Sequence, residues 1–164
     1  MSVSIPNLWG DKLRPPSVSP TAVLRAQAGL LEEVTDGILE GEVEGERKGR
    51  QIELHLDMVA PSLERYRIRL LTVRHLMDRP YPVTVESAFF PAPPPPRPAG
   101  KRNPRGDPHT RQAADHKAFL ELLRSILQSD EVQKLAQSLI ARSNDTSQVT
   151  DPFAGAGVPG NGGK

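Results

Sequence analysis

Hydrophobic residues near the N-terminus recur every three or four positions, which is the period of an α-helix. This pattern predicts an amphipathic helix over 20–35. Ser19 and Pro20 suit its start, because serine is a favoured N-cap and proline is tolerated at the first helical position. Gly37 follows the last periodic residue and suits a left-handed conformation that ends the helix.

The period then changes from 3.6 to two, the spacing at which side chains alternate between the faces of a strand. The alternation predicts strands over 38–46, 51–59, 65–74 and 83–88. Asp78–Pro82 contains two prolines and is interpreted as a loop, because proline cannot continue a central strand. Short connections between four successive strands favour an antiparallel meander with one face on the helix and the other in solvent.

A proline-rich segment separates this body from a second helical region. Residues 91–98 read PAPPPPRP, which is typical of a stiff polyproline II spacer. Helical periodicity returns beyond it, and Ser129 suits the start of a second helix. We therefore expect an α+β fold: an N-terminal helix packed on a four-stranded antiparallel meander, followed after a proline-rich linker by a two-helix hairpin.

Glycine and proline are concentrated in segments that lack periodicity, and these segments set the predicted domain boundaries. The chain has 164 residues with 17 prolines and 13 glycines, enough for one modest core flanked by unstructured segments. In chain order the prediction is a disordered N-terminus (1–18), an α+β body (19–90), a proline-rich basic linker (91–112), a helical hairpin (113–143) and a disordered tail (144–164).

Charge and cysteine content exclude several kinds of chemistry. The formal net charge is +1, so no overall field favours nucleic acid or an acidic membrane. The chain has no cysteine, which excludes disulfides, thiolate metal sites and cysteine nucleophiles. No apolar run is long enough for a signal peptide or a membrane span, so we expect a cytoplasmic protein that does not associate with membranes.

The predicted outer face of the sheet carries charges of both signs. A first strand with four alternating glutamates would lie beside a mixed strand and an arginine-bearing strand. The candidate residues of this charged sheet face are Glu53, His55, Asp57, Arg65, Arg67 and Arg69. One interpretation is a solvated face whose charges discourage stray strand pairing. The other is a recognition surface whose arginines hold carboxylates or phosphates.

Nucleic-acid binding through these arginines and the basic linker is an alternative function, but we do not favour it. The chain has one tryptophan, two tyrosines and four phenylalanines, so it lacks an aromatic platform on which bases could stack.

Three residues of the mixed strand have the chemistry of metal ligands. Glu53, His55 and Asp57 alternate along one face, and oxygen and imidazole groups bind divalent ions. A flat sheet face offers no water-excluded cavity, so we assign no metal site and expect no cofactor. No spacing identifies a catalytic residue. A small metal-dependent enzyme is therefore a second alternative.

The C-terminal helices carry the most complete apolar stripe in the chain. Its members are Phe119, Leu122, Leu123, Ile126, Val132, Leu135 and Leu139. This stripe either folds back onto the body or pairs with another protein or a second copy of the chain. The function we expect is that of a non-enzymatic protein-interaction module, an adaptor or a small subunit of a larger assembly.

Overall fold

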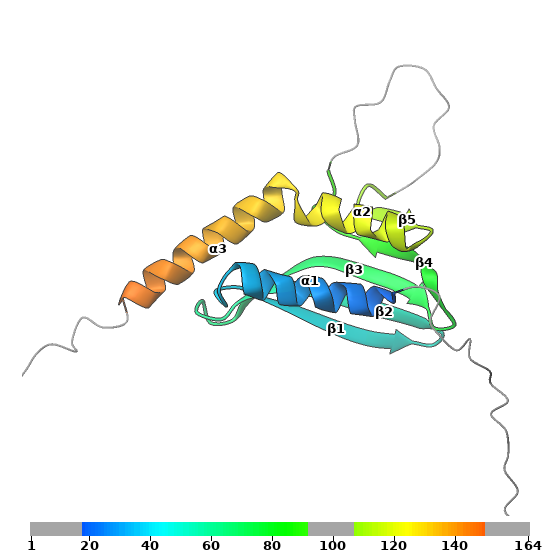
Figure 1. The fold of residues 1–164 in the computed structure, drawn as a ribbon, viewed down its shortest axis with the longest axis horizontal. Coiled ribbons are helices and arrows are strands. Elements are labelled where there is room, and N and C mark those ends of the chain that lie inside the picture. Colours follow the sequence, from blue (N-terminus) through cyan, green and yellow to red (C-terminus); the bar gives the residue numbers. More distant parts are fainter. Residues whose placement is uncertain (1–17, 92–106, 150–164) are drawn as a thin grey trace, which may run out of the picture.

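The computed structural model describes residues 18–91 and 107–149. The predicted disordered N-terminus and C-terminal tail, and most of the predicted proline-rich linker, fall largely outside these residues. Within them the chain forms an α+β fold, as predicted: a helix, an antiparallel sheet and then two helices (Figure 1). None of the described helices is long and apolar enough to cross a membrane.

Eight elements follow one another within the described residues. They are α1 (Pro20–Val34), β1 (Glu40–Lys48), β2 (Gln51–Ala60), β3 (Tyr66–Leu76), β4 (Arg79–Glu86), β5 (Thr110–Ala113), α2 (His116–Leu127) and α3 (Asp130–Val149).

The predicted boundaries of α1 are confirmed by hydrogen bonds at both ends. The Ser19 hydroxyl accepts a bond of 3.2 Å from the backbone N–H of Ala22, as an N-cap does. Beyond the other end, Gly37 has a φ of 75° and its N–H donates to the carbonyl of Glu32 at 2.9 Å. Glycine suits this position because it adopts a left-handed conformation without a steric penalty.

The strands form one antiparallel sheet in the order β1-β2-β3-β4-β5, so the predicted meander is confirmed, with five strands rather than four. The additional strand, β5, spans the end of the segment interpreted as a linker and the first residue of the predicted hairpin segment. Its four residues are mostly polar and do not alternate, so the sequence pattern does not reveal it. Pairing with the last four residues of β4 makes it a strand.

The interpretation of Asp78–Pro82 as a loop is wrong, because β4 begins at Arg79 and includes Pro80 and Pro82. The Tyr81–Pro82 peptide bond is cis. β5 pairs with β4 only from Val83 onwards, so the proline-containing half of β4 has no neighbour on that side. An edge position tolerates proline because no ladder hydrogen bond is lost there.

All three helices cover the same face of the sheet. Figure 1 shows α1 lying along the first strands and α2 beside β4 and β5. α3 runs from the end of α2 towards the turn between β2 and β3, where Ser143 lies near Pro61. The core between helices and sheet includes Leu24, Met58 and Phe119, each almost completely buried.

α3 is longer than the predicted hairpin segment, because it continues to Val149 rather than ending at 143. Its last turns contain serine, asparagine, aspartate and threonine, so they show no apolar period. The hydroxyls of Thr146 and Ser147 donate to the carbonyls of Arg142 and Ser143, four residues earlier, which fits a helix whose polar side chains bond to its own backbone.

α1 approaches β1 so closely that the β1 residue at the contact, Gly41, has no room for a side chain. A Cβ added to Gly41 would lie 2.4 Å from the Cα of Ala28. Glycine therefore allows backbone to meet backbone here. Because α1 and β1 meet at this point, Gly41 determines how deeply α1 sits on the sheet.

We expect Gly41→Ala to destabilise the protein by about 1–3 kcal/mol, because the added methyl group overpacks a rigid backbone contact. The measurement is the free energy of unfolding from urea denaturation. Gly29→Ala is the matched control, because Gly29 lies within α1 and a Cβ there meets nothing within 4 Å. The control should be about 0.4–1 kcal/mol more stable than the wild type. Equal stabilities of the two variants would contradict the close-contact interpretation.

Candidate functional site

An apolar hollow of about 260 Å³ opens between α1 and α3, and we call it the α1–α3 cleft. One wall comes from the C-terminal half of α1, where Leu30, Leu31 and Val34 face the hollow. Leu31 packs against the core, whereas Leu30 is 46% exposed and Val34 is 74% exposed. The rim of this wall therefore presents large apolar side chains to solvent.

The floor and the opposite wall of the cleft are also apolar. Met58 and Leu70 of the sheet form part of the floor, and both are almost completely buried. Leu127, Val132 and Ala136, from the end of α2 and the start of α3, form part of the other wall. The cleft exists because α1 and α2 cover opposite edges of the sheet and α3 only partly closes the space between them.

The residues that line the cleft are suited to apolar contacts rather than to catalysis. None of the described lining residues is acidic, basic or histidine, and the polar ones among them include two glutamines, Gln27 and Gln133. An engineered apolar cavity of about 150 Å³ holds a benzene molecule, so about 260 Å³ has room for two aliphatic side chains. This volume lies just below the usual range for small-molecule pockets.

The apolar stripe predicted as an interaction surface lies mostly in the core of this same chain. Five of its members are buried there: Phe119, Leu123, Ile126, Val132 and Leu139. The other two, Leu122 and Leu135, are partly buried and pack against the same core. The helices therefore fold back onto the sheet, and of the seven stripe residues only Val132 is among those that line the cleft.

The charged sheet face lies on the side of the sheet that the helices leave uncovered, as predicted. β2 lies between β1 and β3, so acidic residues of the first strand and arginines of the third flank the mixed strand. Arg65 pairs with Glu42, and Arg67 pairs with Glu42 and Glu44 across the width of β2. The long arginine side chains thus form a layer over the middle strand.

This layer keeps solvent away from residues that we expected to be exposed. The Asp57 side chain is 1% exposed and lies 3.0 Å from Nε of Arg69 and 3.3 Å from Nη1 of Arg67. A buried carboxylate needs such partners, because an unpaired buried charge is strongly destabilising. The expectation of a fully solvated face is therefore wrong at its centre.

A β-bulge in β3 adds a residue to the charged sheet face that the sequence pattern had missed. Leu56 pairs with Leu71 and Asp57 with Arg69, so Leu70 is the extra residue. The bulge shifts the alternation by one, and Arg74 joins Arg67 and Arg69 on the outer face. The adjacent apolar pair Leu70-Leu71, which interrupts strict alternation, was the available signal.

Arg74 is the main partner of Glu53. Its Nε donates to Oε2 of Glu53 at 2.6 Å, and Nζ of Lys48 donates to Oε1 at 2.9 Å. These two cations lower the pKa of Glu53 from 4.5 to about 2. Arg74 also donates to Glu86 at 2.8 Å, so it links β2 to β4.

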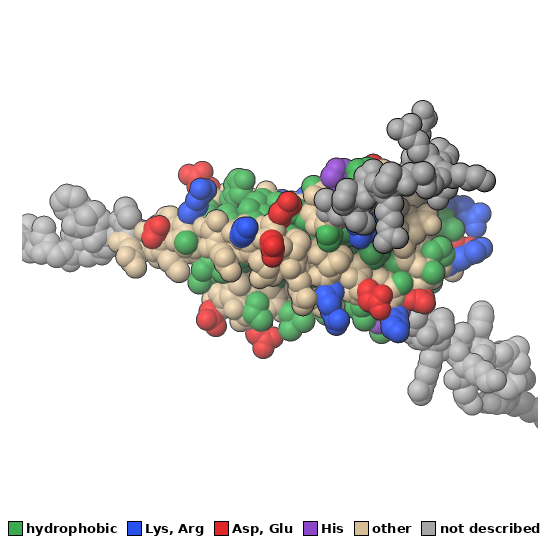
Figure 2. Space-filling view, turned by 90° about the horizontal axis from the view of Figure 1, so that it is seen from above, with side chains coloured by type: hydrophobic (Ala, Val, Ile, Leu, Met, Phe, Trp, Pro, Cys, Tyr) green, Lys and Arg blue, Asp and Glu red, His purple; other side chains and the backbone are tan. Residues whose placement is uncertain are grey.

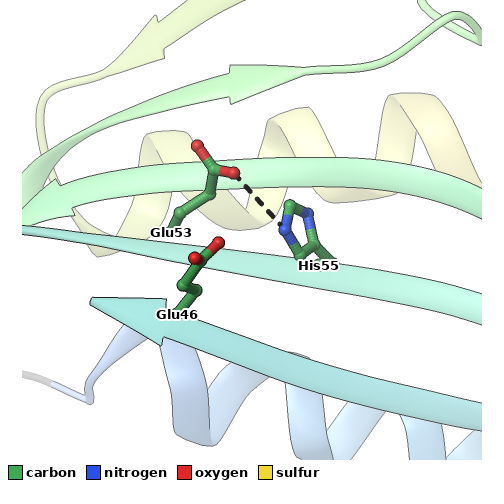
Figure 3. A group of neighbouring side chains, drawn as sticks. All are labelled: Glu46, Glu53 and His55. Atoms are coloured by element: carbon green, nitrogen blue, oxygen red, sulfur yellow. Dashed lines mark ion pairs between the residues drawn. The ribbon is translucent and has the colours of Figure 1, made fainter. Parts of the chain in front are cut away.

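The structure places Glu46, rather than Asp57, with Glu53 and His55 as a set of metal-ligand side chains (Figure 3). One ligand atom from each lies within 4.8 Å of the others, and Nε2 of His55 is 3.4 Å from Oε1 of Glu53. Asp57 is instead held by arginines. Lys48 and Arg74 already bind both oxygens of Glu53, so a divalent ion would have to displace the lysine. We therefore interpret this group as part of the ion-pair network.

A contact of His116 links α2 to the sheet. Nδ1 of His116, the first residue of α2, lies 3.2 Å from the hydroxyl of Tyr81 in β4. The same hydroxyl donates to the carbonyl of Val18 at 3.0 Å. Burial raises the pKa of Tyr81, with a smaller contribution from Asp115. These contacts tie the start of α2 and the segment before α1 to the sheet.

No protein-family model, curated protein or solved structure matches this chain. The case for a function therefore depends on the geometry of the α1–α3 cleft and of the charged sheet face.

We expect Glu53→Gln to lower the free energy of unfolding at neutral pH by about 1–3 kcal/mol, because a charge-assisted contact is lost. The pKa of Glu53 is lower in the folded protein than its value of 4.5 in the unfolded chain, so the ionised carboxylate stabilises the fold above pH 4.5. This contribution is lost as the pH falls towards 2. The difference between wild type and variant should therefore be constant above about pH 5 and shrink below it. Urea denaturation from pH 7 to pH 2 measures it.

The control for this experiment is Glu46→Gln, which removes an exposed carboxylate 3.5 Å from the same lysine. We expect little effect, because exposed ion pairs contribute about 0–1 kcal/mol. If the difference in free energy of unfolding between wild type and Glu53→Gln stayed constant down to pH 2, the assigned role of Arg74 and Lys48 would be contradicted.

Proposed function

We propose that this protein is a non-enzymatic protein-interaction module, an adaptor or a small subunit of a larger assembly, which binds its partner in the α1–α3 cleft. The observation that carries the proposal is the open apolar cleft with Leu30 and Val34 exposed at its rim. Exposed apolar side chains beside a hollow favour association, because both are removed from water when a partner covers them.

The chemistry of the cleft favours a protein segment over a reactive substrate. The lining residues that the structure describes carry no charge and no imidazole. An amphipathic helix is the simplest occupant, because two apolar side chains one turn apart would enter the hollow together. The side-chain amide of Gln27 then supplies hydrogen bonds near the apolar contact, whereas that of Gln133 already donates to the carbonyl of Leu127 at 2.7 Å.

The charged sheet face supports the alternative of nucleic-acid binding less well. Arg65, Arg67 and Arg69 each already pair with carboxylates of β1 or β2. A phosphate would have to compete with these carboxylates. Figure 2 shows a different side of the molecule, seen from above, and there too acidic and basic side chains are interspersed rather than gathered into a stripe of one sign that could follow a phosphate backbone.

We expect a photo-crosslinking amino acid at Gln133 to form one protein adduct of defined mass in the native host. Gln133 is exposed and lines the cleft, so the probe should reach a bound partner without disturbing the core. Adding Val34→Asp should abolish the adduct, because a charge at the rim opposes burial of an apolar partner. The measurement is the mass of the cross-linked species on a denaturing gel.

Met77→Asp is the matched control, since Met77 is 45% exposed, much like Leu30, but lies in the turn between β3 and β4 and does not line the cleft. The adduct should survive this substitution. No adduct from Gln133, or an adduct that both variants keep equally, would count against the proposed function.

A further inference from the structure

The rim of the α1–α3 cleft carries the kind of side chains that would fill such a cleft. Leu30 and Val34 are four residues apart on α1, so they lie on the same side of the helix one turn apart. Both are exposed, and both stand beside the hollow. The same surface therefore presents two apolar protrusions and, next to them, a recess large enough for two aliphatic side chains.

A surface with adjacent protrusions and recess can be complementary to a copy of itself. In an interface with twofold symmetry the same patch is used on both subunits, so each residue contact occurs twice. If α1 of one copy lies across the cleft of another, its Leu30 and Val34 enter that recess. The symmetry then places the corresponding side chains of the second copy in the first cleft.

Charge favours a second copy over a charged partner at this site. Among the described residues that line the cleft there is no acidic or basic side chain, so the apolar contact itself brings no like charges together. The formal net charge of the whole chain is +1, so overall repulsion between copies is also weak. The amide group of Gln27 can both donate and accept hydrogen bonds, which suits a symmetric contact, whereas that of Gln133 already donates to the carbonyl of Leu127 at 2.7 Å.

We propose that the occupant of the α1–α3 cleft is α1 of a second copy of this chain, which inserts Leu30 and Val34 and offers its own cleft in return. This inference rests on the proposed function, because it names the partner of that same site. It makes the protein a twofold-symmetric dimer whose two clefts are filled together.

The first test is the mass of the purified full-length chain in solution, measured by sedimentation equilibrium over a range of concentrations. The wild type should be a dimer that dissociates on dilution. Leu30→Asp and Val34→Asp should each weaken dimerisation by roughly tenfold or more, because a central apolar contact is replaced by a charge that must be buried. Met77→Asp should leave the dimer unchanged.

The substituted side chains are exposed, so the variants should keep the fold, and circular dichroism with thermal unfolding checks this. A wild type that stays monomeric at every concentration would overturn the inference. So would a dimer that persists in both Leu30→Asp and Val34→Asp.

The second test measures which surfaces meet, and it uses the absence of native cysteine. One sample of the chain carries Val34→Cys and another carries Gln133→Cys, and the two are mixed under mild oxidation. Val34 and Gln133 line opposite walls of the cleft, so the proposed dimer brings the cysteine of one copy near that of the other. A mixed disulfide should form faster than in a mixture of Met77→Cys and Gln133→Cys. Equal rates in the two mixtures would contradict the proposed geometry.

The two proposals fail in different ways. If the purified chain is monomeric but Gln133 cross-links to a different protein in the host, the second-copy inference is wrong and the interaction module stands. If the cross-linked species has twice the mass of the chain, both stand. If neither dimer nor adduct forms, both are wrong.

Discussion

The contact between Ala28 and Gly41 is the constraint on which the helical side of this protein depends. Because Gly41 has no side chain, α1 sits with its backbone against β1. This depth places Leu24 and Ala28 in the core and leaves Leu30 and Val34 beside the cleft. A bulkier residue would push α1 away from the sheet, and the wall of the cleft would move with it.

The opposite side of the sheet is organised by charge rather than by apolar packing. α1, α2 and α3 cover the apolar face of the sheet. On the other face, water is excluded from the central residues by side chains of the sheet itself. Arg67 reaches across β2 to Glu44, and together with Arg69 it pairs with the buried Asp57. Arg74 pairs with Glu53 in the same way. Their guanidinium groups pair with the carboxylates, which are thereby removed from water without being left as unpaired charges. This arrangement explains why an ordered row of charges need not be a binding surface.

Much of the fold could be predicted because local signals agreed with one another. Ser19, the helical period that follows it and Gly37 all indicated α1, and the alternation of β1 to β3 indicated a meander. The missed strand had no such signal. β5 is strand only because β4 pairs with it, and a contact between residues far apart in sequence has no local pattern.

The charged sheet face was predicted in outline and missed in detail for a physical reason. Strict alternation assigns Arg65, Arg67 and Arg69 to one face, which is correct up to the bulge. One extra residue at Leu70 then reverses the assignment, so Arg74 reaches Glu53. Period-two reasoning propagates any such shift to every later residue of the strand.

The cleft is the feature that sequence periodicity was least able to predict. An apolar stripe indicates which side of a helix is removed from water, but not whether the chain itself or a partner covers it. The C-terminal helices cover most of their stripe with the sheet, whereas α1 leaves Leu30 and Val34 uncovered. Fully burying a side chain of this kind stabilises a protein by about 1.5–3 kcal/mol, and this stabilisation is not obtained while the side chain stays exposed. α1 could have carried polar residues at both positions without loss to the core, and this is why the exposed pair argues for a partner.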